Sequence, residues 1–302
     1  MSVRVLHIDL GREMRGGQRQ VLLLMRGLRE AGHESILLAR ENAALWRAAV
    51  DADFVVYAGK WRNLRKHSKN ADVVHAHDAR SHTLAAVAIP GKFVVSRRVA
   101  FPVSRTRVSR WKYSRAARYL AVSQCAAEEL LAAGVPPGKI DVVFDGVESP
   151  VCAAQWGIDY PAVALASTDP GKGRDLVEQA AAAAGIPVHY SSDLERDLRR
   201  ASMFVYITRS EGLGSAALLA MSMGIPVVAS RVGGVPEAIA DGESGILVEN
   251  DSAQIAGAMR RMVEDDALAK RCIAGARVRV EKLFSRERLV ERTLSAYRKV
   301  LA

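Results

Sequence analysis

The chain has 302 residues, of which 49% are hydrophobic and 25% charged, and its formal net charge is +10. This length fits two α/β domains better than one core, and the composition excludes a disordered chain. No apolar run approaches the roughly 20 residues of a membrane-spanning helix, and charged residues interrupt the N-terminus where a signal peptide needs its apolar segment. We therefore expect a cytoplasmic protein.

The positive charge is confined to the first half of the chain. Residues 1–147 hold 24 Lys and Arg against 13 Asp and Glu, whereas residues 148–302 hold 19 against 20. Residues 79–127 contain ten cationic side chains and no carboxylate, with aromatic residues among them. Such a segment could contact nucleic acid, an anionic lipid surface or an anionic substrate. It carries no recognised nucleic-acid-reading motif, so we expect no nucleic-acid partner.

Apolar runs and helical segments alternate from the N-terminus. Residues 3–8 are typical of a buried strand, residues 9–17 of a polar loop with glycines, and residues 18–31 of an amphipathic helix. Further strands are expected at residues 35–39, 54–57, 72–75, 92–95, 119–122 and 141–144. This alternation predicts a parallel sheet covered by helices.

A second series of the same kind follows a break at residues 146–161, where glycine and prolines interrupt the pattern and where we place the interdomain linker. Its strands are expected at residues 163–166, 188–190, 203–208, 227–229 and 246–248. Its helices are expected at residues 173–184 and 215–223 and over the last 45 residues. The sequence therefore predicts two Rossmann-like, doubly wound α/β domains, residues 1–147 and 148–302, with a cleft between them.

Two glycine-bearing loops join a strand to a helix, where backbone N–H groups and the positive end of the helix dipole face an anion. The first contains Gly16 and Gly17; it is not a dinucleotide or P-loop motif, and a simple turn is an equal alternative. The second, residues 209–215, places Glu211 beyond the carboxyl end of a strand, where open α/β sheets bind ligands. Such a carboxylate can accept hydrogen bonds from sugar hydroxyls while the adjacent amides hold a diphosphate.

Four motifs in the second half resemble the donor-binding half of glycosyltransferase family 4, a retaining group with the GT-B fold. They read EGLGSAALLAM from Glu211, GIPVVAS from Gly224, GGVPE from Gly233 and DGESGILV from Asp241, in the order and spacing of the family. The first half agrees more loosely, through Gly16-Gly17 and the segment His75-Ala76-His77-Asp78. The resemblance implies two domains facing a central cleft, the first binding an acceptor and the second a nucleotide-sugar.

The resemblance also implies roles for individual residues. Glu211 and His77 would be the catalytic residues: Glu211 would hold donor-sugar hydroxyls, and His77 would lie in the catalytic cleft near the donor sugar. Lys172 would bind the phosphates. The remaining donor-binding residues would be Gly16, Gly17, Gly212, Leu213, Gly214 and Ser215. A cation at Lys172 stabilises the departing diphosphate, which is the work of a divalent ion in metal-dependent enzymes, and no Asp-x-Asp pair lies at a plausible site. We therefore expect no metal and no other cofactor.

Four positions qualify these expectations. The family has a second glutamate eight residues after the first, where this chain has Leu219, so recognition of the ribose must differ. The arginine that usually accompanies the phosphate-binding lysine is replaced by Ser167; Arg174 or Arg209 could compensate. Arg97 and Arg98, at the end of a first-domain strand, bind acceptor or phosphate or form a solvated loop, and the sequence does not decide between these alternatives.

The predicted function is transfer of a sugar, with retention, from a nucleotide-sugar to a lipid-linked or lipopolysaccharide-type anionic acceptor in cell-envelope polysaccharide biosynthesis. The basic first domain would contact an anionic membrane peripherally, at the inner face of the plasma membrane. One alternative is a catalytically weak or inactive protein that binds nucleotide-sugars or glycans, suggested by Leu219 and Ser167. Another is a sugar-nucleotide epimerase or a phosphorylase, since these share the two-domain build.

Overall fold

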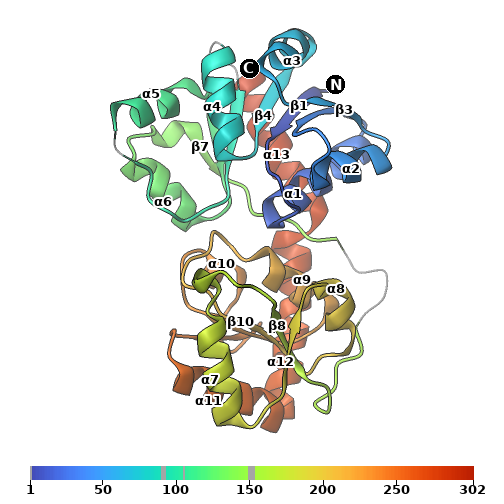
Figure 1. Ribbon diagram of the computed structural model, residues 1–302, viewed down its shortest axis with the longest axis vertical. Helices are drawn as coiled ribbons and strands as arrows, with labels where there is room; N and C mark the ends of the chain where they lie inside the picture. The colour runs from blue at the N-terminus through green and yellow to red at the C-terminus, as the bar shows by residue number, and fades with distance from the viewer. Residues whose placement is uncertain (1, 90–92, 105, 149–153) are drawn as a thin grey trace. The chain divides into compact units, whose positions relative to one another are not determined.

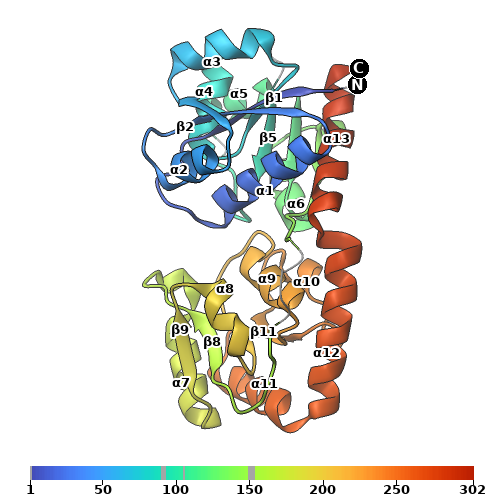
Figure 2. The ribbon, with the colours of Figure 1, turned by 90° about the vertical axis from the view of Figure 1, so that its right-hand side faces the viewer.

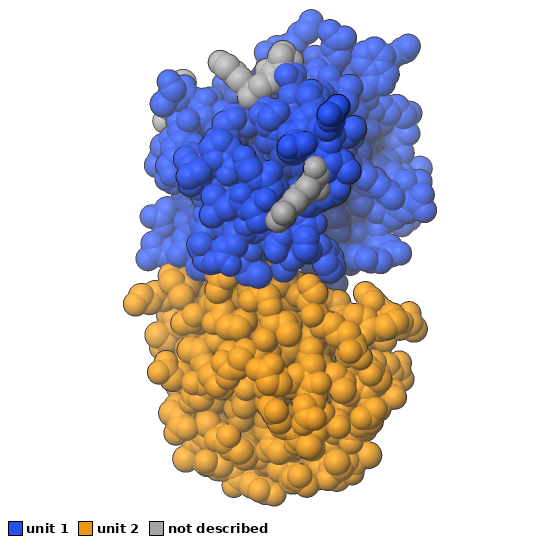
Figure 3. Space-filling view, turned by 90° about the vertical axis from the view of Figure 1, so that its left-hand side faces the viewer, with its two compact units in different colours: residues 1–146, 286–302 blue, residues 147–285 orange. Residues whose placement is uncertain are grey.

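The computed structural model describes residues 2–89, 93–104, 106–148 and 154–302 (Figure 1). The chain forms two compact units, which Figure 3 colours separately. Unit 1 comprises Met1–Gly146 and Arg286–Ala302, and unit 2 comprises Val147–Ser285. Among the described residues, no helix is both long and apolar enough to cross a membrane.

Unit 1 is built on a seven-stranded parallel sheet. Its strands are β1 (Arg4–Asp9), β2 (Glu34–Ala39), β3 (Val55–Ala58), β4 (Val73–Ala76), β5 (Phe93–Arg97), β6 (Arg118–Ala121) and β7 (Ile140–Val142). They lie in the order β3-β2-β1-β4-β5-β6-β7, and every neighbouring pair is parallel. The central strands β1, β4 and β5 are almost wholly buried, as strands covered by helices on both faces must be. The strand order reverses between β1 and β4, which is the topological switch point of this sheet.

Among the described residues, seven α-helices accompany this sheet: α1 (Gly16–Glu30), α2 (Ala44–Asp51), α3 (Trp61–His67), α4 (Ala79–Ala88), α5 (Arg107–Arg115), α6 (Gln124–Ala132) and α13 (Arg286–Leu301). Helices α1 and α13 lie side by side (Figure 2). Leu24 of α1 and Tyr297 of α13 share one core with Val5 of β1 and Val94 of β5. A Cβ atom at Gly27 would collide with Val290, so α13 approaches α1 at a residue without a side chain.

Unit 2 is built on a five-stranded parallel sheet. Its strands are β8 (Ala162–Leu165), β9 (Val188–Ser191), β10 (Phe204–Tyr206), β11 (Val227–Ser230) and β12 (Ile246–Val248), in the order β12-β11-β10-β8-β9. Its helices are α7 (Arg174–Ala184), α8 (Leu194–Asp197), α9 (Ser215–Met223), α10 (Val235–Ala238), α11 (Ser252–Glu264) and α12 (Asp266–Arg279). The switch point of this sheet lies between β8 and β10. Helix α9 is apolar on most of its surface and correspondingly buried.

The structure confirms two doubly wound α/β units with strands at the predicted places. The division of the chain differs at its C-terminal end, because residues 286–302 were expected in the second domain and belong to unit 1. The physical reason is the apolar stripe of α13, including Leu289, Val290 and Tyr297, which completes the unit 1 core. Part of the predicted linker, residues 149–153, lies outside the described residues.

The true division sharpens the charge asymmetry. Unit 1 holds 29 Lys and Arg against 15 Asp and Glu, a net charge of +14, because α13 adds five cationic residues and two acidic ones. Unit 2 holds 14 against 18, a net charge of −4. The basic character therefore belongs to one folded unit and not to the chain as a whole.

Candidate functional site

Lys172 and Glu211 meet at the switch point of unit 2. Lys172 ends a short 3-10 turn (Pro170–Lys172) after β8, and Glu211 follows β10, so both lie beyond the carboxyl ends of the strands where the order reverses. Lys172 Nζ lies 2.9 Å from Glu211 Oε2, and the two side chains remain 30% and 20% exposed. A cation and a carboxylate that are still partly open to solvent can bind a phosphate and a sugar hydroxyl, respectively.

Two further groups orient Glu211. Tyr206 of β10 donates its hydroxyl to Glu211 Oε2 at 2.5 Å, and the Gly212 N–H donates to Oε1 at 3.0 Å. Burial, and then the charge of Glu211, raises the pKa of the Tyr206 hydroxyl well above its ordinary value, so this group remains a donor. Sequence reasoning missed Tyr206, because a tyrosine inside an apolar strand is typical of a core residue and no motif marks it.

The loop after Glu211 is fixed by glycines. Gly214 precedes α9 with φ +107°, a conformation that residues with side chains rarely adopt. A Cβ atom at Gly233 would collide with the Glu211 carbonyl oxygen, and the Gly234 N–H donates to that oxygen at 3.1 Å. The loops that carry the EGLG and GGVPE motifs therefore pack directly against each other and hold the backbone of Glu211 in one position.

Four further predicted donor residues lie between Glu211 and the first turn of α9. Gly212, Leu213 and Gly214 are buried, and Ser215 is half-buried as the first residue of the helix. Gly214 has no side chain with which to cap that turn, so its N–H groups can serve an anionic ligand. Their assignment to a donor remains a prediction.

The two arginines that could replace the missing one at Ser167 have acidic partners of their own. Arg174 pairs with Glu178 at 2.7 Å and stacks over Tyr190. Arg209 pairs with Asp175 at 3.0 Å and donates to the Pro170 carbonyl. Both are exposed, and compensation by either one stays a prediction.

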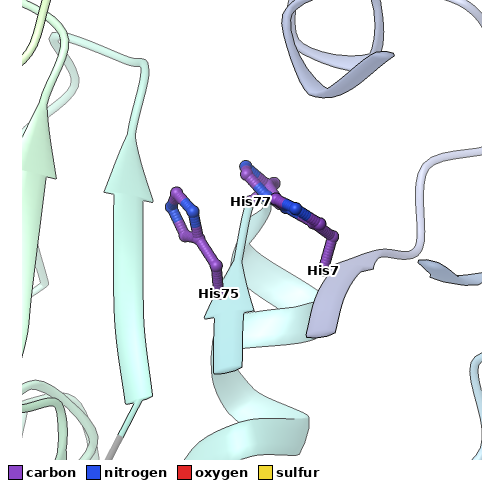
Figure 4. A group of neighbouring side chains, drawn as sticks. All are labelled: His7, His75 and His77. Atoms are coloured by element: carbon purple, nitrogen blue, oxygen red, sulfur yellow. Dashed lines mark hydrogen bonds between the residues drawn. The ribbon is translucent and has the colours of Figure 1, made fainter. Parts of the chain in front are cut away.

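Three histidines gather at the switch point of unit 1 (Figure 4). His7 on β1 lies in register with His75 on β4, and His77 follows β4. All three are buried, and His7 Nδ1 lies 2.9 Å from His77 Nε2. His75 is hydrogen-bonded to the Tyr297 hydroxyl at 2.7 Å and to Ser96 Oγ at 2.8 Å. Burial is the main cause that lowers the pKa of each, that of His7 to about 3, so the cluster is uncharged at neutral pH.

One nitrogen atom from each of these histidines lies within 4.8 Å of the others, a spacing at which neutral imidazoles can hold a metal ion. The nitrogens are engaged in the hydrogen bonds just described. Arg98 Nη1 also lies 3.2 Å from His77 Nδ1, and this positive charge disfavours a second cation beside it. The absence of a metal requirement stays a prediction.

Arg97 and Arg98 diverge, because successive residues of an extended chain point to opposite sides. Arg98 reaches His77, and its Nε pairs with Asp145 at 3.0 Å; these two side chains are only 12% and 10% exposed. Arg97 donates instead to the Tyr113 hydroxyl and to the Phe101 carbonyl. The structure thus brings one of the two predicted arginines to the histidine cluster.

Gly16 and Gly17 form the first turn of α1, and the space in front of Gly17 is open. Asp9, at the end of β1, lies beside this loop and accepts hydrogen bonds from the Gly11 N–H at 2.9 Å and from the Gln18 side chain at 3.0 Å. Burial and the neighbouring Asp78 raise the pKa of Asp9 to about 6. Phosphate binding at this loop remains a prediction.

The basic segment forms an open surface at α5. None of the residues of α5 is buried, and Val108 and Trp111 are exposed among Arg107, Arg110 and Arg115. Two cationic residues of the segment, Lys92 and Arg105, lie outside the described residues. This surface combines positive charge with exposed apolar side chains.

Two family models together match most of the chain. The model described as Glycosyltransferase Family 4 matches residues 14–149, and the model described as Glycosyl transferases group 1 matches residues 163–265. The chain belongs to glycosyltransferase family 4.

Curated relatives of this family 4 chain match over part of their length. D-inositol 3-phosphate glycosyltransferase of Nocardioides sp. is 37% identical over 118 residues, which are 39% of this chain and 26% of that relative. Alpha-maltose-1-phosphate synthase of Mycobacterium tuberculosis is 40% identical over 116 residues, which are 36% of this chain and 30% of that relative. The matched region thus spans about a quarter to a third of each relative.

Solved structures share the fold over almost the whole family 4 chain. Anabaena HepE in complex with UDP and glucose has a TM-score of 0.83 at 14% identity, covering 97% of this chain and 98% of that one. The lipopolysaccharide outer core galactosyltransferase WaaB has a TM-score of 0.72 at 16% identity, covering 97% and 98%. At such identities the likeness shows the fold, which is the two-unit GT-B fold.

Proposed function

We propose that this chain transfers a sugar from a nucleoside diphosphate sugar to an acceptor. The proposal rests on the Lys172–Glu211 pair at the switch point of unit 2. Glu211 accepts hydrogen bonds from hydroxyls of the donor sugar, and Lys172 holds the diphosphate. As the bond to the sugar breaks, negative charge grows on the departing diphosphate, and a fixed cation stabilises it most at that moment.

The amides of Gly212, Leu213 and Gly214 and the first turn of α9 supply further donors to the diphosphate or sugar in this proposal. Tyr206 is not a ligand here; it holds Glu211 in place. HepE was crystallised with UDP and with UDP-glucose, and S. aureus TarM with UDP, so a uridine diphosphate sugar is the first donor to test.

The test is calorimetric titration of the full chain with UDP, GDP, ADP and their common sugar conjugates, without added metal. Lys172→Ala and Glu211→Ala each remove a charge-assisted contact worth about 1.5–3 kcal/mol, so each should weaken the binding of one nucleotide-sugar by about 10- to 150-fold. Lys270→Ala and Asp266→Ala are the matched controls, because they break an exposed ion pair of 2.7 Å elsewhere in unit 2. Failure of the wild-type protein to bind any of these nucleotides would overturn the proposal.

A catalytically weak or inactive binding protein is the second candidate, favoured by Leu219 and Ser167. If these residues limit the donor site, Leu219→Glu and Ser167→Arg should raise donor affinity or turnover. If the wild-type protein binds a donor but gives no product with any acceptor, and the two changes restore turnover, this second candidate is correct. Wild-type turnover that equals or exceeds that of both variants would remove it.

For the acceptor, we propose an anionic, lipid-linked or lipopolysaccharide-type glycan. We propose that the sugar is transferred to it with retention at the anomeric carbon. The support is the net charge of +14 on unit 1 and the likeness of the fold to WaaB, whose name includes such an acceptor. The reaction would belong to cell-envelope polysaccharide synthesis in the cytoplasm. Proton NMR of the product distinguishes retention from inversion by the anomeric coupling.

We also propose that the α5 surface rests on an anionic membrane, because apolar side chains there can enter the lipid interface while arginines meet the headgroups. The protein should float with vesicles containing phosphatidylglycerol, release at high salt, and ignore pure phosphatidylcholine. Val108→Ser should weaken flotation, whereas Val278→Ser, at an exposed valine of unit 2, serves as control. Equal flotation of both variants would exclude α5 as the contact.

A further inference from the structure

A row of polar side chains crosses the sheet of unit 1 in strand order. Ser35 on β2 is followed by His7 on β1, His77 beyond β4, Arg98 beyond β5 and Asp145 beyond β7. The successive distances are 3.3 Å from Ser35 Oγ to His7 Nε2, 2.9 Å from His7 Nδ1 to His77 Nε2, 3.2 Å from His77 Nδ1 to Arg98 Nη1, and 3.0 Å from Arg98 Nε to Asp145 Oδ1. Every step in the row is a hydrogen bond.

The position of each hydrogen atom in the row follows from Arg98. A guanidinium only donates, so Arg98 Nη1 donates to His77 Nδ1, which must be unprotonated. His77 then carries its hydrogen on Nε2 and donates to His7 Nδ1. His7 carries its own hydrogen on Nε2 and donates to Ser35 Oγ. A second proton on either ring would set two donors against each other.

The groups around His77 all disfavour a second proton on its ring. Burial is the largest cause that lowers the pKa of His77, followed by His75, Arg98 and His7. The acidic group in the row, Asp145, pairs with Arg98. On the far side, His75 is held by Tyr297 and Ser96. The geometry of the hydrogen bonds and the local charges therefore agree.

We propose that Arg98, anchored by Asp145, is a positioning residue that fixes His77 and His7 as neutral rings with the hydrogen on Nε2. His77 then has one orientation and one charge state, and it acts neither as a base nor as an acid. The part His77 plays in sugar transfer rests on the proposed function. The assignment of its hydrogen does not, so it can be tested even if no donor is ever found.

The decisive measurement is a long-range proton–nitrogen correlation NMR spectrum of the ¹⁵N-labelled full chain between about pH 5 and about pH 8, where an ordinary histidine titrates. The expected result is that His77 and His7 each show a protonated Nε2 and a bare Nδ1, unchanged over this range. A wild-type spectrum with the hydrogen of His77 on Nδ1, or with a doubly protonated ring, overturns the proposal without any variant.

Arg98→Leu removes both the donor and the charge. It should allow His77 to exchange between tautomers, whereas Arg98→Lys, which keeps a cationic donor, should retain the wild-type spectrum. Arg80→Leu is the matched control, since it removes an exposed arginine of α4. An Arg98→Leu spectrum identical to wild type in a folded protein overturns the proposal; if that variant does not fold, loss of the wild-type tautomer in Arg98→Lys overturns it instead.

Once a donor is known, rescue of turnover separates a positioning role from a structural one. Wild-type turnover should show no histidine titration between about pH 5 and about pH 8. Arg98→Leu should lower turnover, and Arg98→Lys should restore most of it, because a lysine again donates to His77 Nδ1. Equal losses of turnover in the two variants would place Arg98 in the structure alone.

Discussion

The two units share one architecture but place different chemistry at their switch points. Unit 1, with a net charge of +14, buries uncharged histidines there, and unit 2, with a net charge of −4, has a partly exposed ion pair between Lys172 and Glu211. Protonation of a buried neutral cluster is unfavourable, whereas a partly exposed ion pair can exchange its partner for a ligand at a smaller desolvation cost. The difference predicts that the folding stability of unit 1 depends on pH, whereas unit 2 binds the nucleotide.

The largest expected difference between the two units is the loss of folding stability in acid. Burial depresses the folded-state pKa of His7 and His82 to about 3, so the unfolded chain binds protons below pH 6.5 that the folded chain does not. Stability is therefore lost as the pH falls through this window, by about 2 kcal/mol for each of these two residues at pH 5. His75 and His77 act in the same direction, whereas the histidine of unit 2, His189, is exposed.

Urea denaturation at about pH 7 and about pH 5 measures this effect. Single-tryptophan variants that keep either Trp46 in unit 1 or Trp156 in unit 2 report on each unit separately. The Trp46 transition should move to lower urea in acid, and the Trp156 transition should move much less. Equal shifts in the two transitions would contradict the contrast between the units.

Truncation of Tyr297, near the C-terminal end of α13, should destabilise one unit and not the other. The side chain is fully buried in the core of unit 1, so Tyr297→Ala should destabilise that unit by about 3 kcal/mol and leave unit 2 unchanged. Tyr297→Phe is the matched control, because it removes the hydrogen bond to His75 and should cost about 1 kcal/mol. A shift of the Trp156 transition in Tyr297→Ala would mean that α13 also supports unit 2.

Asp9→Asn should stabilise unit 1, by less than Tyr297→Ala destabilises it. The folded-state pKa of Asp9 is raised from 3.8 to about 6, so its contribution to stability is present below pH 4 and is lost as the pH rises through 6. Asp9→Asn keeps an oxygen for Gly11 and Gln18, and should stabilise unit 1 at pH 7 by about 1–2 kcal/mol. The same urea experiment at pH 7 checks it, and a destabilised variant would contradict the raised pKa.

The alternation of apolar strands and amphipathic helices predicted the fold class and nearly every strand, because each element carries its own periodic pattern. The partner of α13 was not predictable in the same way. Its stripe of Leu289, Val290 and Tyr297 specifies a buried face but does not say which core it enters. Only Gly27, a glycine inside α1, hints at the close approach of another helix.

The candidate site was predictable where a motif carried it. Glu211 and Lys172, 39 residues apart, were assigned to one ligand by resemblance, and the structure brings them into contact. Tyr206 and His7 were not assigned, since a buried strand residue shows its polar role only when its spatial neighbours are known. The sequence could not show which of Arg97 and Arg98 reaches His77. Successive side chains at the end of β5 point to opposite sides of the chain, and only the structure shows which side holds the histidines.

Helix α13 follows unit 2 in the sequence but packs in unit 1, and this affects the order in which the two units can fold during synthesis. Because unit 2 is inserted between Gly146 and Arg286, unit 1 is discontinuous in the sequence. A ribosome delivers all of unit 2 before it delivers Tyr297, so unit 2 can complete its core during translation. The large basic unit is begun first, but its hydrophobic core stays incomplete until residues 286–302 have been synthesised.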